Sequence, residues 1–407
     1  MQKQLSLDRY PLAHWIQALQ PSALQDLLAA DNANMISFAL GLPSEEFFPV
    51  GAFQRATAEC LAADPTVLQY GTTTRRLKQH IVRIMHMRGV QCREEQIFLT
   101  AGAQQGLSVL SHLLLQFGGQ IVTESLTYTG IMRVVAPLEP TMVTVPTSKE
   151  EGIDVNALEY RLRSGLRPAF IYLVADGHNP LGVCISREKR QYLADLVQRY
   201  QVPLIEDDPY GFLSFETALP PVRAFNERWV FYVGSLSKIL SPALRIGWII
   251  APEELISKLS AVKEAMDLDI ATFAQHAATW FLDHEDLAAH LRGLQQGYRR
   301  RRDLTEAALK QHIPAEVSWC KPGSGMYFWL ELPSCIDTGI LLKRAVMEER
   351  VAFTPGHAFC ADHARPVSNC LRVCFSHCPL ERIEEGLGRL GRVIHRAGAE
   401  SLFYQCA

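Results

Sequence analysis

The sequence GSLSKILSPALRIGW, residues 234–248, places Lys238 on a turn between two apolar segments. Residues 229–233 before the turn and 246–250 after it consist mainly of β-branched, aromatic and other apolar side chains, which is typical of buried strands. The lysine therefore lies at the end of a predicted strand, where an α/β sheet presents its functional groups.

The same turn carries hydroxyl and guanidinium groups, from Ser235, Ser237 and Arg245. A lysine amine condenses with a carbonyl to form a Schiff base, and hydroxyls with an arginine bind a phosphate dianion through charge-assisted hydrogen bonds. Pyridoxal 5′-phosphate has an aldehyde and a phosphate on one molecule, so the turn indicates a site for this cofactor. Taken alone, Lys238 is also compatible with a solvated loop lysine beside helix-capping serines.

Predicted strands followed by polar loops recur along the chain, with helices between them. The strands end at Thr100, Glu124, Ala175, Glu206 and Gly234. This alternation predicts an α/β fold with a mostly parallel sheet and a site along the strand ends. We expect an N-terminal arm over residues 1–45, a large cofactor-binding domain over 46–285 and a smaller α/β domain over 286–407.

Two helical patterns lie outside the sheet. The arm keeps a loose helical period through Ile16, Leu19, Leu24, Leu27 and Leu28. A long helix is expected near residues 283–311, with the arginines at 299–302 on its solvated face.

Composition limits the classes of function. With 407 residues, 48% of them hydrophobic and 20% charged, the chain resembles an ordinary water-soluble enzyme with room for two domains. A formal net charge of −3 does not indicate a nucleic-acid or membrane partner. The ten cysteines are scattered without CxxC pairs, so neither a metal site nor a disulfide framework is expected, and a cytoplasmic location is the default.

The lysine segment resembles the signature Ser-x-Ser-Lys-x-x-x-Pro-x-x-Arg-x-Gly of the class I and II aminotransferases, which are fold-type I pyridoxal-phosphate enzymes. The resemblance extends from Ser22 to Ser376 and is closest to the branch with 2-aminoadipate and kynurenine aminotransferases. It implies a large domain with a seven-stranded-type, mostly parallel sheet flanked by helices, a smaller C-terminal α/β domain, and a homodimer with shared active sites.

The resemblance assigns several cofactor contacts. Tyr70, in Gln-Tyr-Gly, is similar to a tyrosine that reaches the phosphate of the neighbouring subunit's cofactor. The turn 101–106 resembles the family's phosphate cup, with Ala103 and Gln104 at the contacting positions, and such a turn aims backbone N–H groups at an anion. Tyr128 matches an aromatic residue that lies against the pyridine ring.

The strand ending at Glu206 is followed by Asp207-Asp-Pro-Tyr210. A carboxylate paired with the pyridine nitrogen keeps that nitrogen protonated, so that the ring can accept electrons from a breaking Cα bond. Asp207 matches the family position for this role, and Tyr210 and Asn179 match the residues near the cofactor's ring oxygen. Glu206 and Asp208 are expected to cap local structure or to face solvent.

Substrate contacts are assigned in the same way. The segment 369–376 resembles the family's Asn-x-x-Arg-x-x-Phe-Ser, whose arginine binds the substrate α-carboxylate. Arg372 suits this role because a guanidinium donates two parallel hydrogen bonds to a carboxylate. The other predicted substrate contacts are Asn179 and Gly41. Gly41 begins the Gly-Leu-Pro segment that borders the site.

The chain departs from the family pattern at three places. The loop after Tyr70 is shorter, Ala103 stands where a serine is often found, and His178 stands where glutamine is more common. Nothing in the sequence gives His178 a partner, which argues against a role as a general base.

The combined pattern predicts an aminotransferase that moves the amino group of an L-α-amino acid to a 2-oxo acid through a Lys238 Schiff base, with Lys238 then acting as general base. Elimination or replacement at Cβ or Cγ, cyclisation and oxidation remain alternative outcomes of the same chemistry. A cofactor-binding sensor domain is a further alternative, against which stands the lack of residues for a helix-turn-helix module before residue 35.

Overall fold

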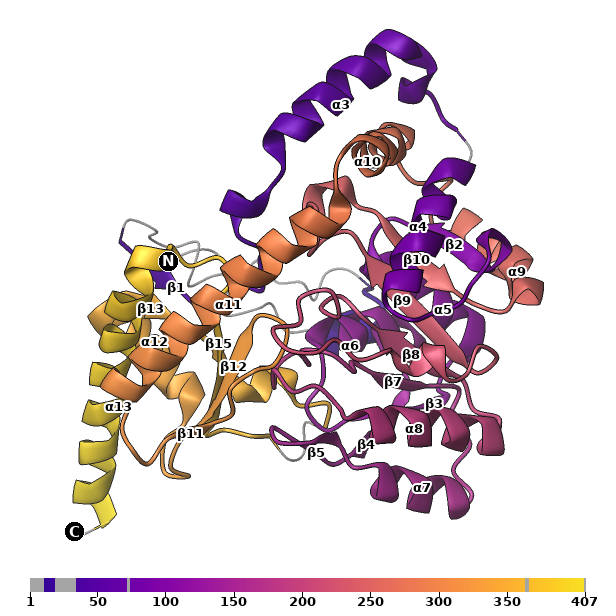
Figure 1. Cartoon of the computed structure of the whole chain (residues 1–407). Coiled ribbons are helices and arrows are strands. Elements are labelled where there is room, and N and C mark those ends of the chain that lie inside the picture. Colours follow the sequence, from indigo (N-terminus) through magenta and orange to yellow (C-terminus); the bar gives the residue numbers. More distant parts are fainter. Residues whose placement is uncertain (1–10, 19–33, 72–73, 363–365, 406–407) are drawn as a thin grey trace.

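A seven-stranded sheet forms the centre of the larger part of the molecule (Figure 1). The computed structural model describes residues 11–18, 34–71, 74–362 and 366–405. The strands, in spatial order, are β2 (Ile97–Thr100), β10 (Gly247–Ile250), β9 (Val230–Ser235), β8 (Leu204–Asp207), β7 (Ile171–Leu173), β3 (Gln120–Glu124) and β4 (Thr141–Val145). β10 is antiparallel to both of its neighbours and the other pairings are parallel, which confirms the mostly parallel sheet.

Helices cover both faces of this sheet. On one face α5 (Ala103–Leu114), α6 (Thr129–Val135) and α9 (Ile256–Glu264) pack in one apolar cluster with strand residues such as Phe231 and Ile249. On the other face α7 (Val155–Arg163) and α8 (Arg187–Tyr200) pack around Leu173 and Leu204. The middle strands are buried along their whole length, because a parallel sheet covered on both faces needs continuous apolar strands.

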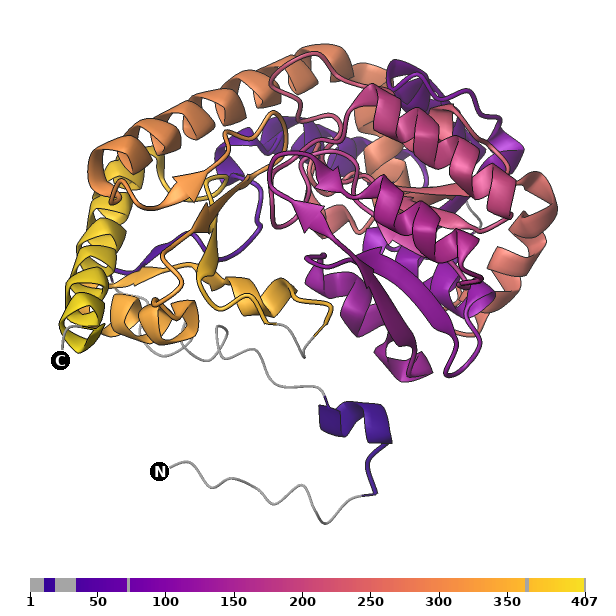
Figure 2. The same ribbon diagram turned by 90° about the horizontal axis from the view of Figure 1, so that it is seen from below.

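The C-terminal part contains a second, antiparallel sheet of four strands. In spatial order these are β11 (Ser318–Trp319), β12 (Tyr327–Glu331), β15 (Cys370–Cys374) and β14 (Thr354–Pro355). The helices α12 (Thr338–Glu349) and α13 (Ile383–Gln405) pack beside it, and the long helix α11 (Leu287–His312) runs from this part to the larger one (Figure 2). The domain boundaries at residues 45 and 285 stay a prediction.

The chain before the large sheet contributes to both parts. β1 (Ile36–Ser37) pairs with β13 (Val351–Ala352), while α3 (Val50–Ala63) packs against α10 (Thr272–His284). Within the expected N-terminal arm, α1 (His14–Ala18) contains Ile16, and Leu19, Leu24, Leu27 and Leu28 lie outside the described residues. The other α-helix and strands of the described residues are α4 (Arg75–Met87), β5 (Thr147–Ser148) and β6 (Gly152–Ile153), and short 3-10 turns lie between several elements.

One surface expectation holds for only part of the arginine run. Arg299 and Arg300 are exposed, as expected, whereas Arg301 and Arg302 are only 3% and 6% exposed. Arg301 donates to the Ser44 hydroxyl and to the Glu46 carboxylate, and Arg302 donates to a backbone carbonyl. The long helix packs against the 40s loop at this point, and tertiary packing of that kind cannot be read from one segment.

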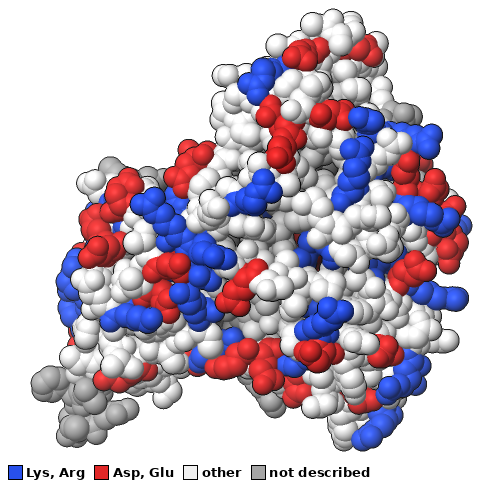
Figure 3. Space-filling model, in the orientation of Figure 1, with Lys and Arg blue, Asp and Glu red and all other residues white. Residues whose placement is uncertain are grey.

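Positive and negative side chains are interspersed over the face shown in Figure 3. Within the described ranges, none of the helices is long and apolar enough to cross a membrane.

Candidate active site

Lys238 lies in the turn after β9, as predicted, and its Nζ donates to the carbonyl oxygen of Gly41 at 2.7 Å. Burial lowers the pKa of Lys238 to about 8, and the charges of Arg372 and Arg245 act in the same direction. Gly41 must lack a side chain, because a Cβ there would lie 2.3 Å from the Tyr327 hydroxyl. The sequence-predicted lysine and glycine therefore lie in contact.

Asp207 is the last residue of β8 and is 3% exposed. Its Oδ2 accepts a hydrogen bond from the Tyr172 hydroxyl at 2.9 Å, whereas its buried Oδ1 has no hydrogen-bond partner within the described residues. Burial raises the pKa of Asp207 to about 7, and the hydrogen bond from Tyr172 opposes that rise. A buried carboxylate oxygen without a donor is costly, so this atom is suited to a ligand that carries a proton or a positive charge.

The two acidic neighbours of Asp207 are buried, and both cap local structure, which is one of the two roles expected for them. Asp208 Oδ1 accepts from the backbone N–H of Gly211 at 2.7 Å. Asp208 accepts hydrogen bonds from Arg88 at 3.0 Å and from the Tyr232 hydroxyl at 2.9 Å. Glu206 accepts from the backbone N–H groups of residues 222 and 223, so it does cap local structure as expected, but in a fully buried position. The burial of these charges is possible because each has fixed donors.

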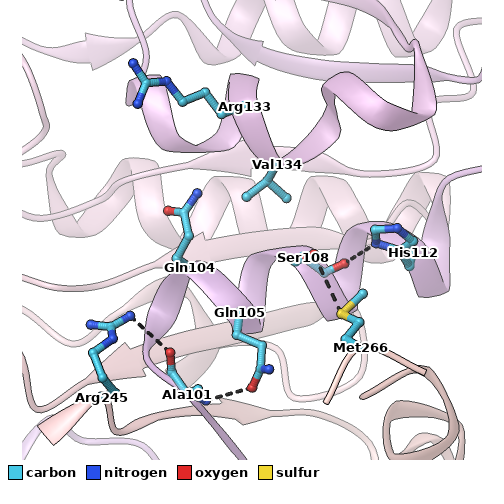
Figure 4. Close-up of a pocket in the computed structure, with 9 residues that line it drawn as sticks. All are labelled: Ala101, Gln104, Gln105, Ser108, His112, Arg133, Val134, Arg245 and Met266. Atoms are coloured by element: carbon cyan, nitrogen blue, oxygen red, sulfur yellow. Dashed lines mark hydrogen bonds between the residues drawn. The ribbon is translucent and has the colours of Figure 1, made fainter. Parts of the chain in front are cut away.

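The turn before α5 brings a helix N-terminus and an arginine together. α5 begins at Ala103 after Gly102, whose φ of +85° suits glycine, and Arg245 crosses over it with Nη2 donating to the Ala101 carbonyl at 3.0 Å. A Cβ on Gly102 would lie 2.4 Å from Arg245 Nη2, so the guanidinium can occupy this position only because residue 102 has no side chain. Figure 4 shows Arg245 beside Ala101 and Gln104 at this end of the helix. These residues line one end of a groove of about 600 Å³.

The other predicted phosphate-side residues lie around the same turn. Gln104 donates to the Gly130 carbonyl at 3.1 Å and accepts from the Tyr128 hydroxyl at 3.3 Å. Ser235 Oγ donates to Ser237 Oγ at 2.8 Å and accepts from the Ser237 backbone at 3.0 Å. Tyr128 has its pKa raised by burial and by the charge of Asp207, which places it between the phosphate turn and the end of β8.

Arg372 projects from β15 of the smaller sheet and is 6% exposed. Its Nη1 donates to Asn179 Oδ1 at 2.6 Å, its Nη2 donates to the Ala39 carbonyl, and its buried Nε has no hydrogen-bond partner among the described residues. The guanidinium lies 4.4 Å from the ring centroid of Tyr327 and 4.8 Å from that of Phe359. A planar cation held between aromatic rings and an amide is suited to a carboxylate.

Tyr210 is buried, and its hydroxyl lies 2.7 Å from the hydroxyl of Tyr327. Sequence reasoning missed Tyr327 and Tyr172. Both are polar-tipped residues within otherwise apolar strands, β12 and β7, and that interruption is the signal that could have found them.

Tyr70 is 80% exposed and lines a separate groove of about 580 Å³ with residues such as Thr272 and His276. It does not join the other site residues within the single chain. Residues 72 and 73 of the shortened loop lie outside the described residues. The role of Tyr70 at a neighbouring subunit's site stays a prediction.

His178 has a partner that the sequence did not reveal. Its Nε2 lies 2.9 Å from Glu124 Oε2, at the end of β3, and both side chains are buried. Its Nδ1 accepts from the Leu181 backbone at 3.4 Å. Nδ1 is therefore hydrogen-bonded, whereas Nε2 and Glu124 Oε2 lie within ion-pair distance without forming a hydrogen bond.

The chain's residues fit pyridoxal phosphate. The unpartnered Asp207 Oδ1 suits a protonated pyridine nitrogen, and the Gly102 turn with Arg245 suits a phosphate. The Lys238 amine, with its lowered pKa, suits reaction with an aldehyde.

Comparison with known proteins agrees with this geometry. Residues 33–390 match the family model described as aminotransferase class I and II. An aromatic-amino-acid aminotransferase of Thermococcus litoralis is 34% identical over 387 residues, 92% of each chain. The crystal structure of Pyrococcus horikoshii kynurenine aminotransferase with PMP, KYN and KYA matches with a TM-score of 0.89 and 31% identity, over 96% of this chain and 98% of that one. An α-aminoadipate aminotransferase of Thermus thermophilus, complexed with N-(5′-phosphopyridoxyl)-L-leucine, matches with a TM-score of 0.87 and 31% identity over 95% and 98%.

Proposed function

Because the chain belongs to the family of class I and II aminotransferases, we propose that Lys238, Asp207 and Arg372 carry out its reaction. The protein is a pyridoxal-phosphate-dependent aminotransferase that moves the amino group of an amino acid to a 2-oxo acid. The family, the fold class, the cofactor and the reaction expected from the sequence are confirmed. The roles of individual residues are our proposal.

Bound pyridoxal phosphate supplies the aldehyde that an amine attacks and the ring that accepts electrons from the substrate Cα. Asp207 Oδ1 would hold a proton on the ring nitrogen, while Tyr172 keeps Oδ2 in place. Asn179 would offer its Nδ2 group to the ring oxygen, because its Oδ1 already accepts from Arg372. Arg245 and the N-terminus of α5 would bind the phosphate.

Lys238 acts twice in this proposal. A pKa near 8 leaves a fraction of the amine neutral at neutral pH, and a neutral amine is the nucleophile that holds the cofactor. The same Nζ, when not bound to the cofactor, would lie where a general base could take the proton from the substrate Cα.

The observation that carries the proposal is the convergence of charged groups from distant segments. Lys238 responds electrostatically to Arg372 and Arg245, and Tyr128 responds to Asp207 and to the same two arginines. Asp207 ends β8, Lys238 follows β9, Arg245 precedes β10 and Arg372 lies in the middle of β15, so an amine, a carboxylate and two guanidiniums come together from both sheets. Perturbed groups that converge in this way are typical of catalytic sites.

A mixing experiment tests the function. The purified protein with bound cofactor should show an absorption band between about 300 and 550 nm that amino acids deplete and 2-oxo acids restore, because each half-reaction converts the cofactor between two forms. Steady-state kinetics should be ping-pong. Release of ammonia or consumption of oxygen, in place of restoration by the 2-oxo acid, would contradict transamination.

Replacing Arg372 with lysine is expected to lower kcat/KM for amino acids by roughly 10²-fold to 10³-fold, because lysine cannot donate two parallel hydrogen bonds to a carboxylate. Most of this loss should appear as a rise in KM, and the absorption band of the bound cofactor should remain. The matched control is Arg344→Lys, at a surface ion pair with Glu400, which should leave kcat/KM unchanged. An unchanged KM in Arg372→Lys would remove this residue from the carboxylate site.

We also propose a homodimer in which Tyr70 completes the partner's site. The large exposed apolar side chains Leu68, Tyr70 and Leu268, at 72%, 80% and 72% exposure, suit burial against a second copy. The cytoplasm is the proposed location, since the nine cysteines of the described residues are all unpaired, as expected in a reducing compartment.

Subunit mixing tests the shared site. Lys238→Ala and Tyr70→Ala homodimers should each be impaired, but hybrids contain one site with both native residues. Random reassociation should therefore recover about a quarter of wild-type activity, since half the dimers are hybrids with one complete site each. No recovery, although hybrids are demonstrated by tagged co-purification, would place Tyr70 and Lys238 in the same chain's site or separate Tyr70 from catalysis.

A further inference from the structure

The hydroxyls of Tyr210 and Tyr327 lie 2.7 Å apart inside the site, and their rings meet edge to face at 5.6 Å. The two residues are 4% and 1% exposed. Neither hydroxyl forms another hydrogen bond to a group in the described part of the chain. One of them therefore donates to the other, and the O–H proton of the accepting hydroxyl has no acceptor among the described residues.

Tyr327 also lies close to Gly41, the hydrogen-bond partner of Lys238, and to Arg372. Its hydroxyl lies against Gly41, whose carbonyl accepts from Lys238. The Arg372 guanidinium lies over its ring, 4.4 Å from the ring centroid. It thus lies between the proposed carboxylate-binding arginine and Tyr210, the tyrosine predicted to lie near the cofactor's ring oxygen.

The arginine decides the direction of the hydroxyl pair. Burial raises the pKa of both tyrosines, and the Arg372 charge opposes that rise at both. The difference between them is geometric, because the guanidinium lies over the ring of Tyr327 at 4.4 Å from the centroid. A cation on the ring face withdraws electron density and makes the phenol a better donor, which favours a hydrogen bond from Tyr327 to Tyr210.

We propose that Tyr327 is a positioning residue for this reaction: its hydroxyl donates to the oxygen of Tyr210, so that Tyr210 directs its own proton to the cofactor's ring oxygen. This inference rests on the proposed placement of the cofactor. Hydrogen bonds in a chain polarise one another, so Tyr210 becomes a stronger donor than an isolated tyrosine. Arg372 thereby acts on the cofactor's ring oxygen through two aromatic side chains.

The test is a pH titration of the absorption spectrum of the holoenzyme, in wild type and in Tyr327→Phe. A strong donor stabilises the ring oxygen's negative charge and so favours the form that has lost a proton. Loss of the Tyr327 hydroxyl should raise the spectral midpoint by about 0.5 to 1 pH unit, the size expected for one neutral hydrogen bond. The phenylalanine ring keeps the contact with Arg372, so the substrate KM should change less than threefold.

Tyr298→Phe is the matched control. Tyr298 is also buried, and its hydroxyl accepts from the Ser44 backbone at 3.0 Å without contacting Tyr210. Its removal should leave the midpoint unchanged. An equal shift in Tyr298→Phe would mean that any lost buried hydroxyl produces the effect, and would overturn the inference.

A double-mutant cycle tests the route through Tyr210. In a Tyr210→Phe background, Tyr327→Phe should cause no further shift, because the hydroxyl through which it acts is gone. Additive shifts, or an unchanged midpoint in the single variant, would overturn the inference. Failure of the wild-type protein to form any lysine-dependent band would instead contradict the proposed role of Lys238, so the two failures are distinguishable.

Discussion

Replacing Lys238 with alanine is expected to lower transamination by at least about 10⁴-fold, because the substitution removes both the amine that holds the cofactor and the base that takes the Cα proton. The absorption band that borohydride traps as a lysine adduct should disappear with it. The measurement combines single-turnover kinetics with the spectrum between about 300 and 550 nm.

The control for this variant is Lys149→Ala. Lys149 is a partly buried lysine that binds the Glu331 carboxylate on β12 and the Ser318 hydroxyl on β11. Its loss should leave the band and the rate intact. A trapped lysine adduct that persists in Lys238→Ala would show that another lysine holds the cofactor, and the assignment would be wrong.

Asp207→Asn is expected to lower kcat by on the order of 10³-fold, because an amide cannot keep the ring nitrogen protonated while the ring accepts electrons. The fold should remain, since asparagine has the same shape and can still accept from the Tyr172 hydroxyl. The surface control Asp195→Asn, on α8, should have wild-type activity. Wild-type kcat in Asp207→Asn would contradict the pairing of Asp207 with the cofactor.

The same substitution should stabilise the apoprotein at high pH. The pKa of Asp207 is raised from 3.8 to about 7, so the folded state favours the protonated carboxyl. Its contribution to stability is complete below pH 3.8 and is lost as the pH rises through about 7. Above that pH the variant has no charge to bury. Its free energy of unfolding should therefore exceed that of wild type by a few kcal/mol, the order of magnitude that corresponds to the pKa shift.

Chemical denaturation of both apoproteins near pH 5.5 and pH 8.5 measures this effect. Glu206 also has its pKa raised to about 7 by burial, so the wild-type curve alone does not isolate Asp207. The difference between wild type and Asp207→Asn does isolate it, because Glu206 is common to both. A difference that does not grow with pH would contradict the raised pKa.

The strands and their functional ends could be predicted from the sequence. Each parallel strand is a short apolar run bounded by turn residues, and the polar residue that follows must lie at the sheet's carboxyl edge. Lys238 and Asp207 were located in this way, and both lie where expected. Ala103 and Gln104 at the start of α5 follow from the same local rule.

Side-chain partners from distant segments could not be predicted. Asp208 and Glu206 were expected to cap local structure or face solvent, since charges usually do not lie fully inside unless they are paired. Their donors are Arg88, at the end of α4, and the 222–223 backbone, which the fold brings to the strand end. The Glu124 partner of His178 was missed for the same reason.

The sequence by itself determined which residue types stand at the carboxyl ends of the strands, and therefore the cofactor and the class of reaction. This was possible because strand period, turn chemistry and the lysine motif are local properties of the chain. Only the tertiary structure decided the state of those residues. The unpartnered Oδ1 of Asp207, the lowered pKa of Lys238 and the Tyr327–Tyr210 hydroxyl pair arise where two sheets meet. Burial and through-space charge depend on what surrounds a side chain, and segments far apart in the sequence supply those surroundings.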